Sequence, residues 1–180
     1  MRSLDILLIG DYGWTLDMTD PNHNFDAINS YVGNLTSQGG KIDFIMTTGD
    51  NIYVRNESYP SLSEADLMMT LFQKRANLKD LTIYPIRGNH DCYAKDPYFE
   101  VNLTKRYSNW EMPSLYYERL FDIGGNKKLG VLFVDTCLAI CGNYTYGEDH
   151  ISEDAPHEIR EMKRLMDVKC DDQFSYEQGR

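Results

Sequence analysis

Three short apolar runs, each ending near a glycine that is followed by a polar residue, constrain the fold of this chain most. The runs occupy residues 4–9, 42–46 and 81–86. Each is rich in aliphatic residues and nearly uninterrupted, which is typical of a strand buried on both faces of a sheet.

Two helix patterns separate these runs. Residues 21–37 and 63–76 carry apolar side chains at the three- and four-residue spacing of an amphipathic helix. These side chains are Phe25, Ile28, Val32 and Leu35 in the first pattern, and Leu67, Met68, Leu71 and Phe72 in the second. The alternation of strand and helix predicts parallel strands joined by right-handed crossovers, and therefore an α/β fold.

The pattern changes in the second half of the chain. We expect a helix at residues 99–107, followed by strands at 115–123 and 129–135 that form a hairpin across a Gly-Gly-Asn turn. A loop and a last polar helix are expected at residues 137–156 and 157–168. The 180 residues, 42% of them hydrophobic, are enough for one domain with a core, which we assign to residues 1–180.

Charge and hydropathy exclude two classes of partner. The net charge is −10 and the pI is near 4.8, so the phosphates of nucleic acids and anionic membrane surfaces are repelled. No apolar run approaches the roughly 20 residues that a membrane-spanning helix needs. The run at 4–9 precedes no cleavage site of small residues, so it is predicted to be a strand rather than a signal peptide.

Glycosylation and cysteine patterns bear on localisation. Four N-x-[ST] sequons begin at Asn34, Asn56, Asn102 and Asn143. They favour a glycoprotein of the secretory route, lysosomal or extracellular, with the sugars on surface loops. The cysteines are Cys92, Cys137, Cys141 and Cys170. They match no metal-binding spacing and allow three pairings, so buried free thiols and one disulfide both stay open.

The polar residue after each apolar run is an oxygen donor. Asp11, Asp50 and Asn89 each follow a glycine, and 39 residues separate each from the next. That interval is about one strand–helix unit, so the three residues should meet at the carboxyl edge of the sheet, where α/β folds bind ligands. Any one of them alone is more typical of a turn or helix cap. Together they predict a site for cations.

The motifs around these residues resemble a known family. They are GDYG at residues 10–13, GDNIY at 49–53 and GNHD at 88–91. The set resembles the metallophosphoesterases, and a tyrosine three residues after Asp50 resembles the purple acid phosphatases among them. Two further segments resemble the tartrate-resistant branch: WEMPS at 110–114, and VDTC at 134–137 running to CGN at 141–143.

The resemblance implies a binuclear metal centre and assigns ligands to it. Asp11 and Tyr53 would hold Fe(III), because hard oxygen donors, including a phenolate, suit that ion. Asp50 would bridge both metals. The side-chain oxygen of Asn89 would bind the second metal, which would be Fe(II), Zn or Mn.

The implied reaction is hydrolysis of a small phosphomonoester or a phosphoprotein. His90 would contact the phosphate and protonate the leaving oxygen, and Asp91 would orient His90 by a hydrogen bond. The metals would clamp the phosphate and acidify a water for in-line attack. They would also supply the positive charge that lets an acidic chain bind an anion.

The family pattern is incomplete in this sequence. The family's later GHxP-like and GHxH motifs supply three histidine ligands, and neither motif occurs here. The remaining histidines, His23, His150 and His157, are expected to be ordinary surface residues. The resemblance thus covers about the first half of an αββα sandwich. It implies under-coordinated metals and an open sheet face that a companion chain or segment would cover.

Three hypotheses for function stay open. The chain is part of an active acid phosphatase, a catalytically inactive phosphatase-like subunit of a larger complex, or a module that binds phosphate or metal without turnover. The isolated chain is expected to be inactive. By analogy with the tartrate-resistant branch, Cys141 would pair with a cysteine beyond the chain end.

Overall fold

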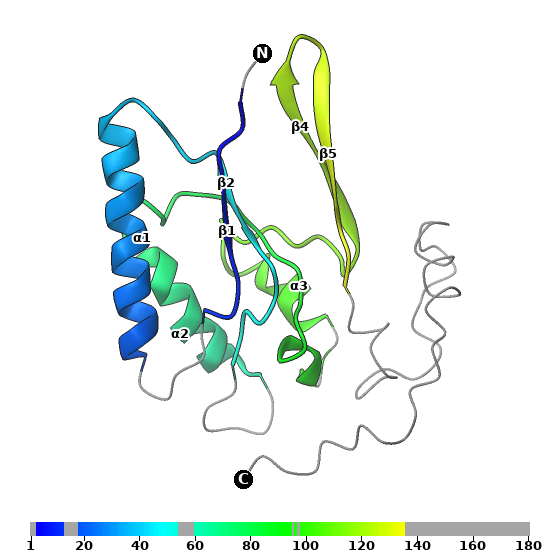
Figure 1. Ribbon diagram of the computed structural model, residues 1–180. Helices are drawn as coiled ribbons and strands as arrows, with labels where there is room; N and C mark the ends of the chain where they lie inside the picture. Colours follow the sequence, from blue (N-terminus) through cyan, green and yellow to red (C-terminus); the bar gives the residue numbers. More distant parts are fainter. Residues whose placement is uncertain (1–2, 13–17, 54–59, 95, 97, 136–180) are drawn as a thin grey trace, which may run out of the picture.

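The fold is a parallel sheet with two helices on one side and a β-hairpin on the other (Figure 1). This computed structural model describes residues 3–12, 18–53, 60–94, 96 and 98–135. The loop and helix expected at residues 137–156 and 157–168 lie outside the described residues.

The three apolar runs form the parallel sheet. Its strands, in the order β1-β2-β3, are β1 (Ile6–Ile9), β2 (Phe44–Thr47) and β3 (Ile83–Tyr84). The parallel pairing confirms the prediction from the strand–helix alternation. All four side chains of the central strand β2 are buried. Strand β3 is shorter than its apolar run because Pro85, the next residue, has no backbone N–H for the ladder.

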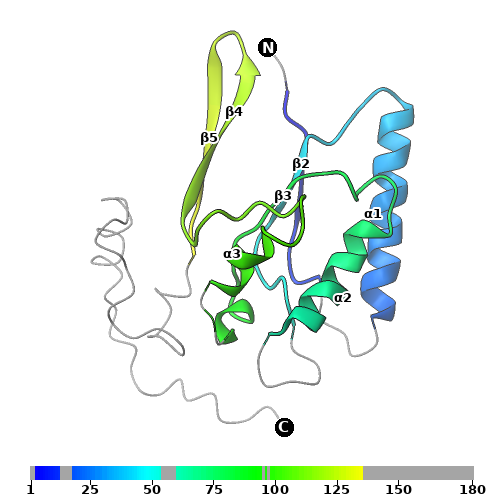
Figure 2. The same cartoon turned by 180° about the vertical axis from the view of Figure 1, so that it is seen from behind.

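Helices α1 (Thr19–Ser37) and α2 (Leu62–Gln73) lie side by side on the sheet face opposite the hairpin (Figure 2). Phe25 of α1 meets Phe72 of α2 edge to face, with ring centroids 4.9 Å apart. Both rings are buried, so this contact joins the two helices to one core.

Helix α2 differs from its prediction at both ends. The hydroxyl of Ser61 accepts a hydrogen bond from the backbone N–H of Glu64, which is the capping-box spacing, so the helix begins before Ser63. It ends at Gln73 rather than at residue 76. Of the predicted apolar stripe, Leu67 is exposed and the other three side chains are buried.

The hairpin confirms its prediction. Strands β4 (Tyr117–Gly124) and β5 (Lys127–Phe133) pair antiparallel. The residues between them include Gly125 and Asn126, both with positive φ, as a tight turn requires. Helix α3 (Phe99–Leu103) precedes the hairpin and is shorter than the predicted 99–107.

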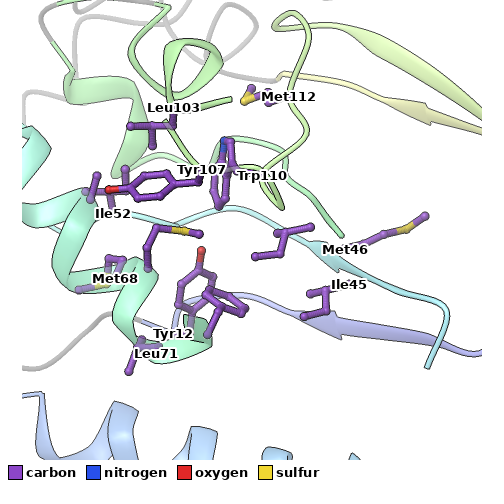
Figure 3. Close-up of a cluster of buried hydrophobic side chains, with 14 of the residues drawn as sticks. Tyr12, Ile45, Met46, Ile52, Met68, Leu71, Leu103, Tyr107, Trp110 and Met112 are labelled. Carbon is purple, nitrogen blue, oxygen red and sulfur yellow. The ribbon is translucent and has the colours of Figure 1, made fainter. Parts of the chain in front are cut away.

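Aromatic and aliphatic side chains join the layers. Phe44 of β2 stacks on Phe121 of β4 with ring centroids 4.2 Å apart, which fixes the hairpin against the sheet. Figure 3 shows Met68 of α2, Ile45 of β2 and Trp110 in the core cluster. Ile45 and Ile83 are completely buried between the sheet and the helices.

Three leucines on the sheet and hairpin are more than half exposed. Leu8 of β1 is 62% exposed, Leu120 of β4 58% and Leu132 of β5 52%. Leu8 pairs with Met46, which lies two residues after Phe44 on β2, so Leu8 and Phe44 share one face of the sheet. This is the face on which the hairpin packs, but the hairpin leaves Leu8 uncovered. Leu120 and Leu132 alternate with the residues that face the sheet, so they point away from it. The described residues thus form the layers helices, sheet and hairpin, with apolar area open on the last two.

Two of the glycosylation sequons lie on helices, not on the surface loops expected from the sequence. Asn34 lies in α1 and Asn102 in α3, so these two sequons are exposed on helices rather than on loops. The other two sequons lie outside the described residues.

Cys92 is disulfide-bonded, and the other three cysteines lie outside the described residues, which leaves the pairing open. Within the described ranges, no helix combines the length and apolar character needed to cross a membrane.

Candidate metal centre

The predicted cation site is built from the loops that follow β1, β2 and β3. Asp11 follows β1 and Asp50 follows β2, and both have left-handed backbones, with φ of 54° and 52°. Aspartate tolerates this conformation better than most residues, yet it costs free energy. Two aspartates with strained backbones at matched strand ends are typical of a functional site.

Glycines let these loops approach one another closely. A Cβ on Gly49, whose φ is 102°, would lie 2.6 Å from the Cα of Gly88. A Cβ on Gly88 would lie 2.2 Å from Oδ1 of Asp50. Only glycine fits at both positions, so the loops after β2 and β3 are in direct backbone contact.

Tyr53 joins the two aspartates. Its hydroxyl lies 3.2 Å from Oδ1 of Asp11 and 3.0 Å from Oδ2 of Asp50, and the side chain is buried. Burial raises the pKa of the Tyr53 phenol well above its usual value, and the nearby charges of Asp50 and Asp11 raise it further. The phenol is therefore protonated here and supplies the hydrogen that sits between two carboxylates.

His90 borders this group, and Asn89 directly precedes it in the chain. The backbone N–H of His90 donates to Oδ1 of Asp50 at 3.0 Å, and its ring lies against the ring of Tyr53, with centroids 4.5 Å apart. The side chain of Asn89 is exposed. The structure thus brings Asp11, Asp50 and Tyr53 together through hydrogen bonds and places the His90 ring beside them.

Asp91 has contacts beyond those expected from the sequence. The residue lies in a 3-10 turn, η1 (Asp91–Tyr93), and its carboxylate is buried. It accepts hydrogen bonds from the backbone N–H groups of Asn51, Ile52 and Gly88. Its carboxylate therefore clamps the loop after β2 to the loop after β3, whereas the sequence predicted that it orients His90.

Sequence reasoning missed two buried polar partners of Asp91. Asn51 and Glu100 are almost inaccessible, and the Asn51 amide donates to the Glu100 carboxylate at 2.9 Å. Burial raises the pKa of Asp91 to about 6, and burial also raises the pKa of Glu100 well above its usual range. For Glu100 the sequence offers one signal, a charged residue between apolar neighbours, and for Asn51 it offers none.

A buried ion pair anchors the hairpin to the same region. The guanidinium of Arg87, directly before Gly88, donates through Nε to the carboxylate of Asp135 at 2.8 Å, and both side chains are buried. Asp135 lies two residues after β5. The ion pair connects the hairpin end to the loop that carries Asn89 and His90.

The donors present fit a hard cation but not a complete binuclear centre. The oxygen atoms of Asp11, Asp50 and Tyr53 lie close together, because the Tyr53 hydroxyl hydrogen-bonds to both carboxylates. Oxygen donors are the ligands that Fe(III) prefers. Among the residues the structure describes, no group of three or more His, Cys, Asp and Glu side chains is placed to hold a metal. His23 is exposed on α1, as predicted, and His150 and His157 lie outside the described residues.

The fold and the strand-end site define a metallophosphoesterase domain of mixed α/β structure. The chain belongs to the calcineurin-like phosphoesterase family, whose model matches residues 4–175. The family consists of metal-dependent phosphoesterases, and membership confirms the predicted fold class, consistent with a partial αββα sandwich. No curated protein matches the chain.

One solved structure similar to the chain is GAP50, described as the anchor in the inner membrane complex of Plasmodium. The identity is 16%, the TM-score is 0.46, and the match covers 79% of this chain. The chain spans 45% of that structure's length. At this level of similarity, neither the fold nor the function of the Plasmodium protein carries over.

Proposed function

We propose that this chain supplies the first half of a binuclear phosphomonoesterase centre of the purple acid phosphatase type. The observation that carries the proposal is the Tyr53 hydroxyl, which bonds to both Asp11 and Asp50. A buried tyrosine between two carboxylates is a set of oxygen donors that suits a ferric ion. An ordinary turn does not need such a set of side chains.

Each side chain then has a role. Asp11, Asp50 and Tyr53 would hold the ferric ion, and Asp50 and the side-chain oxygen of Asn89 would hold the second metal. The ions, when bound, supply Lewis acidity and an acidified water. His90, held by its ring contact with Tyr53, donates the proton that the leaving oxygen needs.

The proposal is tested by ferric titration of the purified chain. Chelator-buffered Fe(III) should produce a visible tyrosinate-to-iron band. Tyr53→Phe should abolish the band, Asp50→Ala should abolish iron binding, and Asp80→Ala, which removes an exposed carboxylate elsewhere, should change neither. A wild-type chain that binds no more iron than Asp50→Ala would reject the proposal.

Turnover is tested where the remaining ligands are present. Hydrolysis of p-nitrophenyl phosphate should be undetectable with the isolated chain and should appear when a segment bearing GHxP and GHxH motifs is joined to it, with zinc or manganese supporting the second position. Bis(p-nitrophenyl) phosphate should be a poorer substrate than the monoester. Preference for the diester would refute the monoesterase assignment.

A second function, that of a catalytically inactive assembly subunit, is favoured by the exposed leucines. Leu8 on the sheet, and Leu120 and Leu132 on the outer face of the hairpin, expose two apolar surfaces that a companion chain or segment would cover. If the native neighbour packed there carries a GHxH motif, the phosphatase proposal gains. If the neighbour is unrelated and the native complex holds no iron, the assembly role replaces it. Phosphate binding without turnover would support a third role, capture of the anion.

Residence in the secretory route, lysosomal or extracellular, is also proposed. The exposed side chains of Asn34 and Asn102 are accessible to glycan attachment. Native material should lose mass when treated with an N-glycosidase. An unchanged intact mass would reject both the glycoprotein assignment and the proposed route.

A further inference from the structure

Asn51 is a buried side chain near the centre that hydrogen-bonds to several segments of the chain. Its Oδ1 accepts a hydrogen bond from the hydroxyl of Tyr12 at 3.2 Å. Its Nδ2 donates to the backbone oxygen of Ile86 at 2.7 Å and to Oε2 of Glu100 at 2.9 Å, and it also lies 3.3 Å from Oδ2 of Asp91. One amide with no solvent exposure therefore contacts the loop after β1, the segment after β3, and helix α3.

The backbone of Asn51 completes this network. Its N–H lies 3.0 Å from both carboxylate oxygens of Asp91, which also accepts from Ile52 and Gly88 at 2.8 Å. The network thus spans all three loops without using any of the candidate metal ligands.

The network alternates with the ligands along the chain. In each loop, a candidate ligand has a network residue as its neighbour or near neighbour. The three pairs are Asp11 with Tyr12, Asp50 with Asn51, and Asn89 with Asp91. A displacement of the network therefore moves every ligand-bearing segment.

We propose that Asn51 is a positioning residue that sets the register of the three ligand loops. This inference rests on the proposed function, because that function is what identifies the metal ions as the ligands of these loops. The position requires an amide because it must accept from Tyr12 while donating to Ile86 and Glu100. Aspartate in its place would donate nothing and would add a third buried carboxylate beside Asp91 and Glu100.

Glu100 provides a means of reversing the change. Its Oε2 accepts from Asn51, while its Oε1 is buried with no partner among the described residues. In the double variant Asn51→Asp/Glu100→Gln, donor and acceptor exchange places in this one hydrogen bond and the buried charge at the pair stays the same, while the donations to Ile86 and Asp91 remain lost. Recovery in this variant distinguishes a specific hydrogen bond from general packing.

The test is amide hydrogen exchange of the metal-free chain, with Asn51→Asp, the double variant, and Val32→Ala as the control. Val32 is a buried residue of α1, so its truncation destabilises the core away from the loops. The reporters are the amides of Ile52 and His90, which donate to Asp91 and Asp50. After correction for global stability, Asn51→Asp should speed their exchange about tenfold or more, as loss of a hydrogen bond to a charged group implies.

The double variant should exchange more slowly than Asn51→Asp, and Val32→Ala should leave corrected exchange unchanged. Equal corrected exchange in Asn51→Asp and Val32→Ala would overturn the proposal. If Asn51→Asp does not fold, Tyr12→Phe removes one bond of the network, and the amide of Asp11, which donates to Gly49, is then the reporter. Unchanged exchange there overturns it equally.

Ferric titration separates this inference from the proposed function. A wild-type chain without the tyrosinate band, but with the exchange pattern above, supports the positioning role and rejects the iron site. A wild-type band that persists at full intensity and unshifted wavelength in Asn51→Asp overturns the positioning role and supports the iron site.

Discussion

Gly88→Ala should disrupt the junction between two ligand loops. The added methyl would lie 2.2 Å from Oδ1 of Asp50 and 2.4 Å from its backbone nitrogen. Because ordinary carbon contacts begin near 3.4 Å, the loops after β2 and β3 must separate by about 1 Å.

That separation breaks specific bonds. The His90 N–H to Asp50 bond is 3.0 Å long, and the Ile52 N–H to Asp91 bond is 2.8 Å. Stretched by about 1 Å, neither remains a hydrogen bond. Overpacking costs about 1–3 kcal/mol, and each lost bond to a charged group costs about 1.5–3 kcal/mol. Since these terms overlap, we expect the free energy of unfolding to fall by about 3–5 kcal/mol.

The assay is urea unfolding of the chelator-treated chain, followed by circular dichroism and extrapolated to water. Gly39→Ala is the matched control, because Gly39 has a φ of 85° and open space around it. It should cost only the left-handed backbone penalty of about 1–2 kcal/mol. A Gly88→Ala loss within about 0.5 kcal/mol of the Gly39→Ala loss would refute the close-contact reasoning.

Two further predictions concern catalysis and pH. In an assembled enzyme, His90→Ala should keep full metal content by elemental analysis and lower kcat about 10²- to 10⁴-fold, as loss of a general acid implies; unchanged kcat refutes the role. The raised pKa values of Asp91 and Glu100 mean that the folded chain binds more protons than the unfolded one. Their contribution to stability is complete in acid and is lost as the pH rises through about 6, the folded pKa of Asp91. The urea midpoint of the metal-free chain should therefore be higher at pH 5 than at pH 7.5, and Glu100→Gln should shrink that difference; a flat wild-type profile would contradict it.

The sheet and the convergence of the aspartates could be predicted from the sequence. Three buried strands and their equal spacing place Asp11 and Asp50 at one edge, because the carboxyl ends of parallel strands coincide. These two features follow from period and spacing, which a single sequence displays. The phenol that joins the aspartates, Tyr53, was implied only by the resemblance to the purple acid phosphatases.

The polar network could not be predicted in the same way. Asn51 stands between a ligand and an apolar residue, and nothing in its type separates a buried amide from a turn residue. Asp91 adjoins His90 in sequence, which suggested that it orients His90. In the structure Asp91 begins a 3-10 turn, and its carboxylate accepts a hydrogen bond from Ile52 in the loop after β2. Burial of polar groups is a tertiary property, since it depends on which segments the chain brings together.

The Tyr53 proton gives the proposed centre a stoichiometric signature. In the metal-free chain this proton lies between Asp11 and Asp50, where it reduces the repulsion of two carboxylates. A cation that binds the phenolate must displace it, because a ligand binds metal in its deprotonated form. Fe(III) titration in a pH-stat should therefore release one more proton per ion from the wild-type chain than from Tyr53→Phe, provided that the variant still binds iron through the two aspartates. Equal proton release from both chains would place the phenol outside the metal's coordination shell and remove the feature that distinguishes a purple acid phosphatase centre from the rest of its family.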